Sequence, residues 1–335
     1  MKKLIILFVI GLYLGFSALS FSQGNLGQSG ANFLQIAMEP RGAALGGAIT
    51  AISDGAAALY WNPAGAVHTE NIDINFSHTD WFLDTKLMYV GVVKNMDRIG
   101  AFGISFTSFY MDEMEITTVY DSEGENSGTY DAGDLAVGLS YARSLTDRFT
   151  FGVTAKFVRE EIWNLSSSQV ALDVGSLYRT DFLNLRLGMA VRNFSDKMKF
   201  DGDAIDERIQ EEVDRGLTNN IRIERLTPEF RLPQVFQLGI AFDPVQMESG
   251  SLTLLADVTV PSDNEELMVF GAEYQFQKLA YIRGAYRVNY ESGDFSFGGG
   301  LNLNIGGFNS RFDYSYSTMG LLGSVHRFGL GLAIK

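Results

Sequence analysis

The sequence predicts an all-β fold, a transmembrane antiparallel β-barrel of about 14 strands, with a small N-terminal helical hatch, or plug, in its lumen. Three observations predict it. From about residue 71 onward, segments of ~10 residues alternate large apolar side chains with small or polar ones. Glycine and charge share the second face of many of these segments. Finally, short and long connections alternate between the segments, as they do in outer-membrane barrels.

The alternation is clearest in residues 149–157, 236–242 and 311–316. In the first segment Phe149, Phe151, Val153, Ala155 and Phe157 alternate with Thr150, Gly152, Thr154 and Lys156. Successive side chains of a strand point to opposite faces, so such a strand has one apolar face and one polar or small face. A soluble β-sandwich also alternates, but the glycines and charges of the second face and the pattern of loop lengths favour the barrel.

We expect about fourteen strands, each bounded to within a few residues. They are 71–79, 84–95, 98–109, 133–144, 149–163, 167–180, 184–194, 233–242, 251–260, 267–276, 279–290, 294–304, 308–317 and 324–334. An even count puts both ends of the barrel on the periplasmic side, and the two longest connections, 110–132 and 195–232, then both fall on the extracellular side. The first and last strands must pair, because an open sheet edge cannot face hydrocarbon.

The N-terminus predicts a secretory signal peptide over residues 1–22, cleaved before Gln23. Lys2 and Lys3 precede an apolar run of 13 residues that ends at Phe16, which is shorter than the roughly 20 residues of a membrane-spanning helix. The chain then divides into a hatch segment, 23–70, and the barrel, 71–335. This organisation predicts a multi-pass protein of the bacterial outer membrane.

Composition excludes several classes of function. The formal net charge is -14, so nucleic acid is a poor partner, since its binding depends on lysine and arginine at phosphates. Cysteine is absent, which removes disulfides and thiolate metal sites even in an oxidising compartment.

The segment from 24 to 70 does not alternate and is too small to form a core of its own. It is rich in glycine and alanine, which suits a plug packed closely inside a lumen. Residues 54–60 predict a short helix, capped by Ser53 or Asp54 and ended by Pro63.

Two stretches of this segment carry a resemblance to a known family. Residues 39–48, EPRGAALGGA, and 51–65, AISDGAAALYWNPAG, resemble the N-terminal signature of the PorV/PorQ family. These outer-membrane proteins are related to the FadL-type fatty-acid transporters. The resemblance implies a fourteen-stranded FadL-like barrel with an N-terminal hatch, in which Asn62-Pro63-Ala64 matches the hatch's Asn-Pro-Ala element, and a role in type IX secretion.

The candidate site residues all lie in the hatch. Asn62, Pro63, Ala64 and Gly65 form the hatch motif, which is either a helix stop followed by a turn or a gating and ligand-contact element. The hatch glycines are Gly42, Gly46 and Gly47. They do not have the spacing of a phosphate loop, so we interpret them as packing residues.

We expect no catalytic, metal or cofactor site, and therefore no enzyme. The histidines are His68, His78 and His326, and they show no metal-ligand spacing and no paired serine. Charged residues on the lumen face carry both signs, and we expect most to pair with one another, with the hatch or with water; a polar solute path is the alternative. These residues are Lys156, Asp173, Arg186, Arg192, Asp257, Glu273, Arg283, Arg287, Arg311 and Asp313.

Two functions follow from these expectations. The family resemblance implies an accessory or cargo-shuttle component of type IX secretion, with a translocon, an attachment complex or secreted cargo docking on loops 110–132 and 195–232. The second loop contains a helix-like pattern at Ile205, Ile209 and Val213, suited to a lid or a docking surface. The alternative is a FadL-like passive transporter of a small hydrophobic ligand across the outer membrane. In both cases outer-membrane lipid surrounds the barrel.

Overall fold

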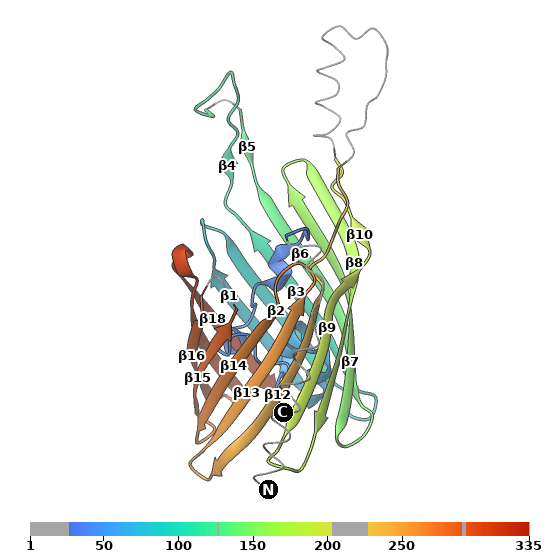
Figure 1. Cartoon of the computed structure of the whole chain (residues 1–335), viewed down its shortest axis with the longest axis vertical. Coiled ribbons are helices and arrows are strands. Elements are labelled where there is room, and N and C mark those ends of the chain that lie inside the picture. Colours follow the sequence, from blue (N-terminus) through green and yellow to red (C-terminus); the bar gives the residue numbers. More distant parts are fainter. Residues whose placement is uncertain (1–26, 126, 203–226, 290–292, 335) are drawn as a thin grey trace.

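The computed structural model describes residues 27–125, 127–202, 227–289 and 293–334. Over these residues the chain forms a closed antiparallel barrel of fourteen strands, as predicted (Figure 1). The strands are β1 (Ile72–Asp80), β2 (Lys86–Asn95), β3 (Ala101–Tyr110), β6 (Ala132–Ser144), β7 (Phe149–Ile162), β8 (Leu165–Arg179), β9 (Arg186–Ser195), β12 (Val235–Met247), β13 (Gly250–Pro261), β14 (Leu267–Phe276), β15 (Ala280–Val288), β16 (Phe295–Ile305), β17 (Phe308–Thr318) and β18 (Ser324–Ile334).

The first and last strands close the barrel. β1 pairs with β18 over its whole length, from Ile72 opposite Ile334 to Asp80 opposite His326. Each strand also pairs with its neighbour in the chain order of the barrel, so both edges of every strand have hydrogen-bonding partners. In hydrocarbon an unpaired backbone group costs several kcal/mol, which only a closed barrel avoids for strands.

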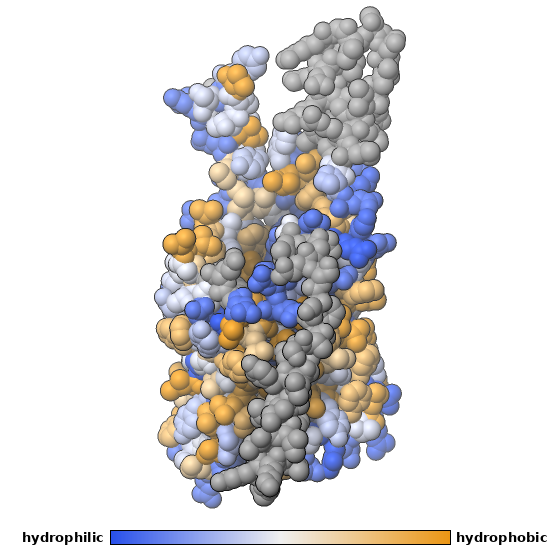
Figure 2. All heavy atoms as spheres, in the orientation of Figure 1, coloured by the Kyte–Doolittle hydropathy of each residue, from blue (hydrophilic) through white to orange (hydrophobic). Residues whose placement is uncertain are grey.

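The two faces of the strands separate as the alternation predicts. In β7, Phe151 and Phe157 are exposed on the outside, whereas Thr150 and Thr154 are buried in the lumen. Figure 2 shows apolar side chains gathered over the strands, with hydrophilic ones at the lower end and near the upper rim. Such a surface suits a barrel whose wall contacts lipid.

The two longest connections lie at the same end of the barrel, as predicted. Residues 111–131 join β3 to β6 and carry the hairpin β4 (Met114–Glu115) and β5 (Thr129–Tyr130). Residues 196–234 join β9 to β12 and carry β10 (Lys197–Met198) and β11 (Phe230–Arg231). Figure 1 shows β4, β5 and β10 at the upper end, which is the extracellular end in the expected orientation.

Two predicted features fall outside the described residues, namely the signal peptide and the helix-like pattern at 203–213. One strand is longer than expected. β12 continues to Met247 because a register shift between Phe242 and Val245 accommodates one extra residue and lets pairing with β13 resume.

The hatch segment folds as a plug inside the barrel, drawn in blue in Figure 1. Its helices are η1 (Asn32–Gln35), α2 (Pro40–Ala44), η2 (Gly55–Ala57), α3 (Ala58–Trp61) and η3 (Pro63–His68). α2 lies against β15, β16, β17 and β18, and η3 against β6, β7 and β8. None of the helices in the described residues is both long and apolar enough to cross a membrane.

The helix expected at 54–60 is present as η2 and α3, it ends at Asn62 before Pro63, and its N-cap residue is Asp54, one of the two predicted. Asp54 makes no side-chain capping bond, however, and the Ser53 hydroxyl donates to the Asn62 carbonyl at 3.4 Å. The acceptor comes from the barrel wall instead, since Asp73 Oδ1 on β1 accepts from the Ala56 N–H at 2.7 Å. The wall carboxylate therefore supplies the hydrogen-bond acceptor that an N–H at the helix start needs.

The plug forms its core with the barrel wall. One cluster joins Leu45, Ile49 and Trp61 of the plug to Leu255 and Val269 of β13 and β14. Two further clusters also mix plug and wall side chains. The segment has no core of its own, as expected, and its apolar side chains are buried against the lumen face of the barrel. Each buried apolar side chain contributes about 1.5–3 kcal/mol to the free energy of folding.

Candidate functional site

The plug is attached to the barrel wall through Arg41 at the start of α2. Its guanidinium binds both carboxylate oxygens of Glu273 on β14, at 3.0 and 3.1 Å, and also contacts Asp54 at 3.1 Å. The pairing with Glu273 is bidentate, which is the strongest geometry for an arginine and a carboxylate. One plug side chain thereby joins two parts of the plug to the wall.

The ion network continues along the wall. Arg283 on β15 bridges Glu273 at 2.6 Å and Asp313 at 2.5 Å, and Arg311 on β17 contacts Asp313 at 3.3 Å. With Arg41 and Asp54, this gives three arginines and three carboxylates. Equal numbers of opposite charges in mutual contact are what a water-poor lumen requires, because an unpaired buried charge is costly. The expectation that most lumen charges are paired is confirmed for these residues.

The plug members of the network stay ionised. Burial opposes the charge of Asp54, but Arg41 and Arg311 hold the pKa of its carboxyl below the usual value. Burial likewise opposes the charge of Arg41, but Glu273 and Asp54 raise its pKa well above the usual value. The attachment therefore persists across neutral pH.

The hatch motif holds the plug on the opposite wall. Asn62 Oδ1 accepts from the Ala64 N–H at 3.2 Å and so caps η3, while Nδ2 donates to the carbonyls of Thr50 at 3.0 Å and Ser176 at 3.1 Å. Pro63 is the first residue of η3, where its fixed φ suits the helix and its missing N–H is not needed. The motif acts here as a helix cap and a wall contact.

Glycines of the strands form a bed for the plug. At several strand glycines, an added Cβ would come within 3.0 Å of a plug atom, which is closer than side chains pack. Gly175 lies against Asn62, Gly152 against Pro63 and Ala64, and Gly188 against Thr50. Gly91 and Gly103 receive Ala56 and Leu59 in the same way. Small wall residues therefore let the plug backbone approach the strands.

The hatch glycines contribute from the plug side. A Cβ at Gly42 would overlap the Trp61 ring, and Gly65 lies equally close to the Ser53 carbonyl. Gly46 and Gly47 have φ of +64° and +94°, values that side chains other than glycine rarely adopt.

The three histidines lie on three elements and have different partners, although His78 and His326 are on the paired strands β1 and β18. His68 lies in η3, His78 on β1 contacts Asp80 at 3.2 Å, and His326 on β18 contacts the Tyr314 hydroxyl at 2.8 Å. Within the described ranges, no three His, Cys, Asp or Glu side chains are grouped as a metal site would need. Burial and the nearby Arg179 lower the pKa of His68 from 6.5 to about 4, so it is neutral at pH 7.

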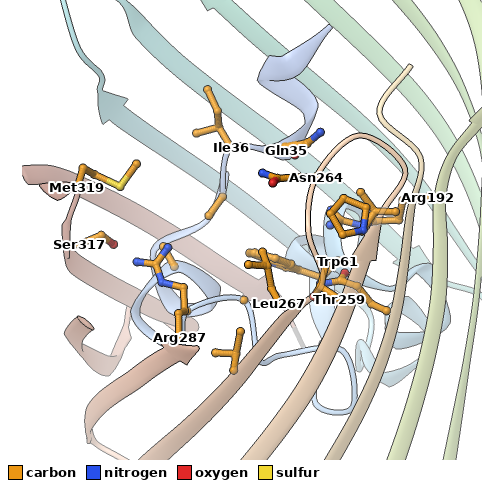
Figure 3. Close-up of a pocket in the computed structure, with 18 of the residues that line it drawn as sticks. Gln35, Ile36, Trp61, Arg192, Thr259, Asn264, Leu267, Arg287, Ser317 and Met319 are labelled. Carbon is orange, nitrogen blue, oxygen red and sulfur yellow. The ribbon is translucent and has the colours of Figure 1, made fainter. Parts of the chain in front are cut away.

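A cavity of about 230 Å³ lies between the plug and the extracellular half of the wall. It is lined by plug residues that include Ile36 and Trp61, and by the upper parts of β9, β12, β13, β14, β15, β17 and β18. Figure 3 shows Arg192 and Trp61 on one side of the cavity and Arg287, Ser317 and Met319 on the other.

The comparison with known families identifies the chain's relatives. The family model described as "Type IX secretion system protein PorV" matches residues 22–259. The chain belongs to the PorV family. A search of curated proteins gave no match.

Solved structures of FadL-type barrels resemble this PorV-family fold. The toluene transporter TbuX of Ralstonia pickettii matches with a TM-score of 0.55 at 14% identity, over 88% of this chain and 97% of its own. A FadL homologue of Pseudomonas aeruginosa matches at 0.54 and 12%, over 89% and 98%. The toluene transporter TodX of Pseudomonas putida matches at 0.53 and 12%, over 87% and 95%. At this identity the likeness shows the fold alone, which is a FadL-like barrel.

Sequence reasoning found the wall charges of this PorV-family barrel but missed their plug partners. Arg41 was present only as a letter of the family signature and Asp54 only as a possible helix cap, although charged residues in a segment rich in glycine and alanine were the available signal. The residues that line the cavity were not predicted, because they come from seven strands and the plug.

We expect Arg41→Gln to destabilise the plug by about 3–5 kcal/mol, because Glu273 loses a buried bidentate partner. The measurement is a denaturant titration of the solubilised barrel followed by tryptophan fluorescence. Arg148→Gln is the matched control, since it removes an ion pair to Asp181 that is more than half exposed, and it should change stability by about 0–1 kcal/mol. Equal effects of the two substitutions would contradict the network's role.

Gly175→Ala should cost about 1–3 kcal/mol, because the added methyl group overlaps the Asn62 amide. Gly299→Ala is the control on β16, where an added Cβ finds its nearest neighbour at an ordinary 3.4 Å. The same titration compares the two variants, and a glycine bed is excluded if they behave alike.

Stability should fall as the pH drops from 6.5 to about 4, because His68 takes up its proton more readily in the unfolded chain than in the plug. His68→Gln should remove this part of the pH dependence and leave the loss from carboxylates. Unfolding free energies of both proteins across that range test it, and parallel curves would count against a buried neutral His68.

Proposed function

We propose that the protein is an accessory or cargo-shuttle component of type IX secretion in the outer membrane of a two-membrane bacterium. The observation that carries the proposal is membership of the PorV family. It would act through its extracellular surface, where a translocon, an attachment complex or secreted cargo docks. The plug supports this choice, because ion pairs and close packing fix it in the lumen and disfavour the barrel as a path for a polypeptide.

The hairpin β4–β5 and the connection around it provide a highly accessible part of that surface. Val119 and Tyr120 are 97% and 95% exposed, beyond the rim of the barrel. Large apolar side chains held in solvent are typical of residues that a partner covers. Aromatic residues such as tyrosine are enriched at such contacts.

A deletion strain tests the role itself. Loss of the protein should leave cargo in the periplasm and remove it from the cell surface, as measured by surface proteolysis and fractionation. Cargo that still reaches the surface in normal amount would reject the proposal.

Val119→Asp with Tyr120→Asp then tests the surface. We expect reduced surface cargo with normal barrel assembly, because two charges replace the apolar contact. Leu321→Asp is the control, since Leu321 is equally exposed on another extracellular connection, in η4 (Gly320–Leu322). If both proteins support secretion equally, docking lies elsewhere.

The alternative role is passive transport of a small hydrophobic ligand, and the cavity above the plug is the observation that favours it. Transport would require the plug to move. If the protein is such a transporter, the same deletion strain should take up hydrophobic solutes more slowly while secretion stays normal. Unchanged uptake of long-chain fatty acids would remove this alternative.

A further inference from the structure

A segment at the start of the hatch connects the plug to the extracellular rim. We call residues 27–36, which include η1, the strap; Figure 1 shows it in dark blue, above the rest of the plug. The Gly30 N–H donates to the Arg231 carbonyl at 3.0 Å, and Ser29 pairs with Arg231 as a parallel β-bridge. The strap thus adds a third segment to the two-stranded sheet β10–β11, which forms the base of the connection 196–234.

Two carboxylates of the barrel also hold the strap at the rim. Asp263, in the turn between β13 and β14, accepts from the Ser29 hydroxyl and from Gln35 Nε2, the latter at 3.0 Å. Glu160, at the upper end of β7, accepts from the Ala31 N–H at 2.7 Å. Ala31 has a φ of +50°, a strained conformation that persists in a residue with a side chain where surrounding contacts hold it. The strap is therefore fixed by β11, by β7 and by the β13–β14 turn.

The other end of the strap is bonded to the plug through Tyr60 of α3. The Tyr60 hydroxyl lies 3.1 Å from the Leu34 carbonyl and 3.0 Å from the Ile36 carbonyl, and its one proton is donated to this pair of acceptors. Tyr60 stands two residues before Asn62, which bonds the plug to the barrel wall. A displacement of the strap is therefore passed directly to α3.

Apolar side chains of the strap and of the β10–β11 sheet share one core. Phe33 and Leu34 of η1 are buried in a cluster with Met198 of β10, with Leu232, which follows β11, and with Val158 of β7. A two-stranded sheet of this size is at best marginally stable by itself. Loss of the strap would also expose the cluster to water. The base of the connection therefore depends on the strap for its stability.

The strap is held less firmly than the rest of the plug. Residues 27–36 contain no charged side chain, so hydrogen bonds and apolar contacts alone hold the strap in place. By contrast, Arg41 joins α2 to Glu273 and Asp54 through ion pairs. Hydrogen bonds beside water are exchanged at a small net cost, whereas a buried ion pair is expensive to break. Segments of this kind open locally before the remainder of a structure does.

We propose that the strap couples the base of the connection 196–234 to the plug, so that a partner that displaces the β10–β11 sheet also shifts α3. The coupling is reciprocal, because a change at either end acts on the same bonded segment. The identity of the partner, a protein that docks on this extracellular connection, rests on the proposed secretion role. The coupling itself is a property of the barrel and its plug.

Hydrogen exchange of the solubilised full chain, resolved by mass spectrometry, tests the coupling from the plug side. Tyr60→Phe removes the hydroxyl that joins α3 to the strap and keeps the ring. We expect amide exchange in residues 229–232 to accelerate by about threefold or more, although the lost hydroxyl bonds to the strap and not to β11. Tyr141→Phe is the matched control, because its hydroxyl bonds to the Ile99 carbonyl at the other end of the barrel. It should leave this exchange unchanged.

The reverse test starts from the rim. Asp263→Ala removes the side-chain acceptor of Ser29 and Gln35, and exchange in residues 58–62 of the plug should accelerate by about threefold or more. Asp181→Ala is the control, since it removes an exposed ion pair at the opposite end of the barrel. The coupling is rejected if exchange changes in the strap alone, with residues 229–232 unaffected by the first variant or the plug unaffected by the second.

A disulfide tests whether the strap must separate from β11 during secretion. The chain has no cysteine, and residues paired across a β-bridge lie within the Cα separation of about 4.4–6.8 Å that a disulfide spans. Ser29→Cys with Arg231→Cys should therefore lock the strap to β11. In the deletion strain, the locked protein should place about threefold less cargo on the cell surface than Ser29→Cys alone. A phosphine reductant should restore the cargo, which shows that the locked protein is folded.

Normal secretion by the locked protein would overturn the displacement of β10–β11 by a partner. If instead the deletion strain itself secretes normally, the secretion role fails. The exchange measurements on the purified protein then still decide the coupling, so the two failures are distinguishable.

Discussion

Closure of the backbone ladder between β1 and β18 is the constraint on which the rest of the molecule depends. A strand in lipid must pair on both edges, because no water is present to satisfy its N–H and C=O groups. The chain meets this requirement with a full-length pairing from Ile72 opposite Ile334 to Asp80 opposite His326. Closure fixes which face of each strand meets lipid, and it also creates a lumen that the protein must fill.

The plug fills part of that lumen by two physical means on two sides. Against β7, β8 and β9 the contact is steric, since Gly152, Gly175 and Gly188 leave room for the plug backbone. Toward β14, β15 and β17 the contact is electrostatic, through the network that Arg41 joins. Steric fit sets the position of the plug, while the buried charges make one orientation strongly preferred over others.

The remaining space above the plug differs in character from both contacts. The network below it balances three arginines with three carboxylates, whereas the cavity is lined by arginines alone among its described charged residues. The plug contributes Trp61 to the lining of the cavity, and the Ala37 carbonyl accepts a hydrogen bond that orients Arg327. The plug therefore both obstructs the lumen and forms part of the cavity wall. Binding of any ligand in the cavity would consequently depend on the position of the plug.

The sequence by itself determined the strands, their faces and the barrel. The two-residue alternation is local, so the residues of each strand indicate which of its faces is apolar and which is polar. It also placed the helix before Pro63 and the two long connections at one end. Only the tertiary structure decided that Asp73 rather than Ser53 or Asp54 supplies the acceptor at the helix start, and that Arg41 meets Glu273. Those contacts join residues far apart in the chain, so they depend on barrel closure and strand register, which no local pattern records.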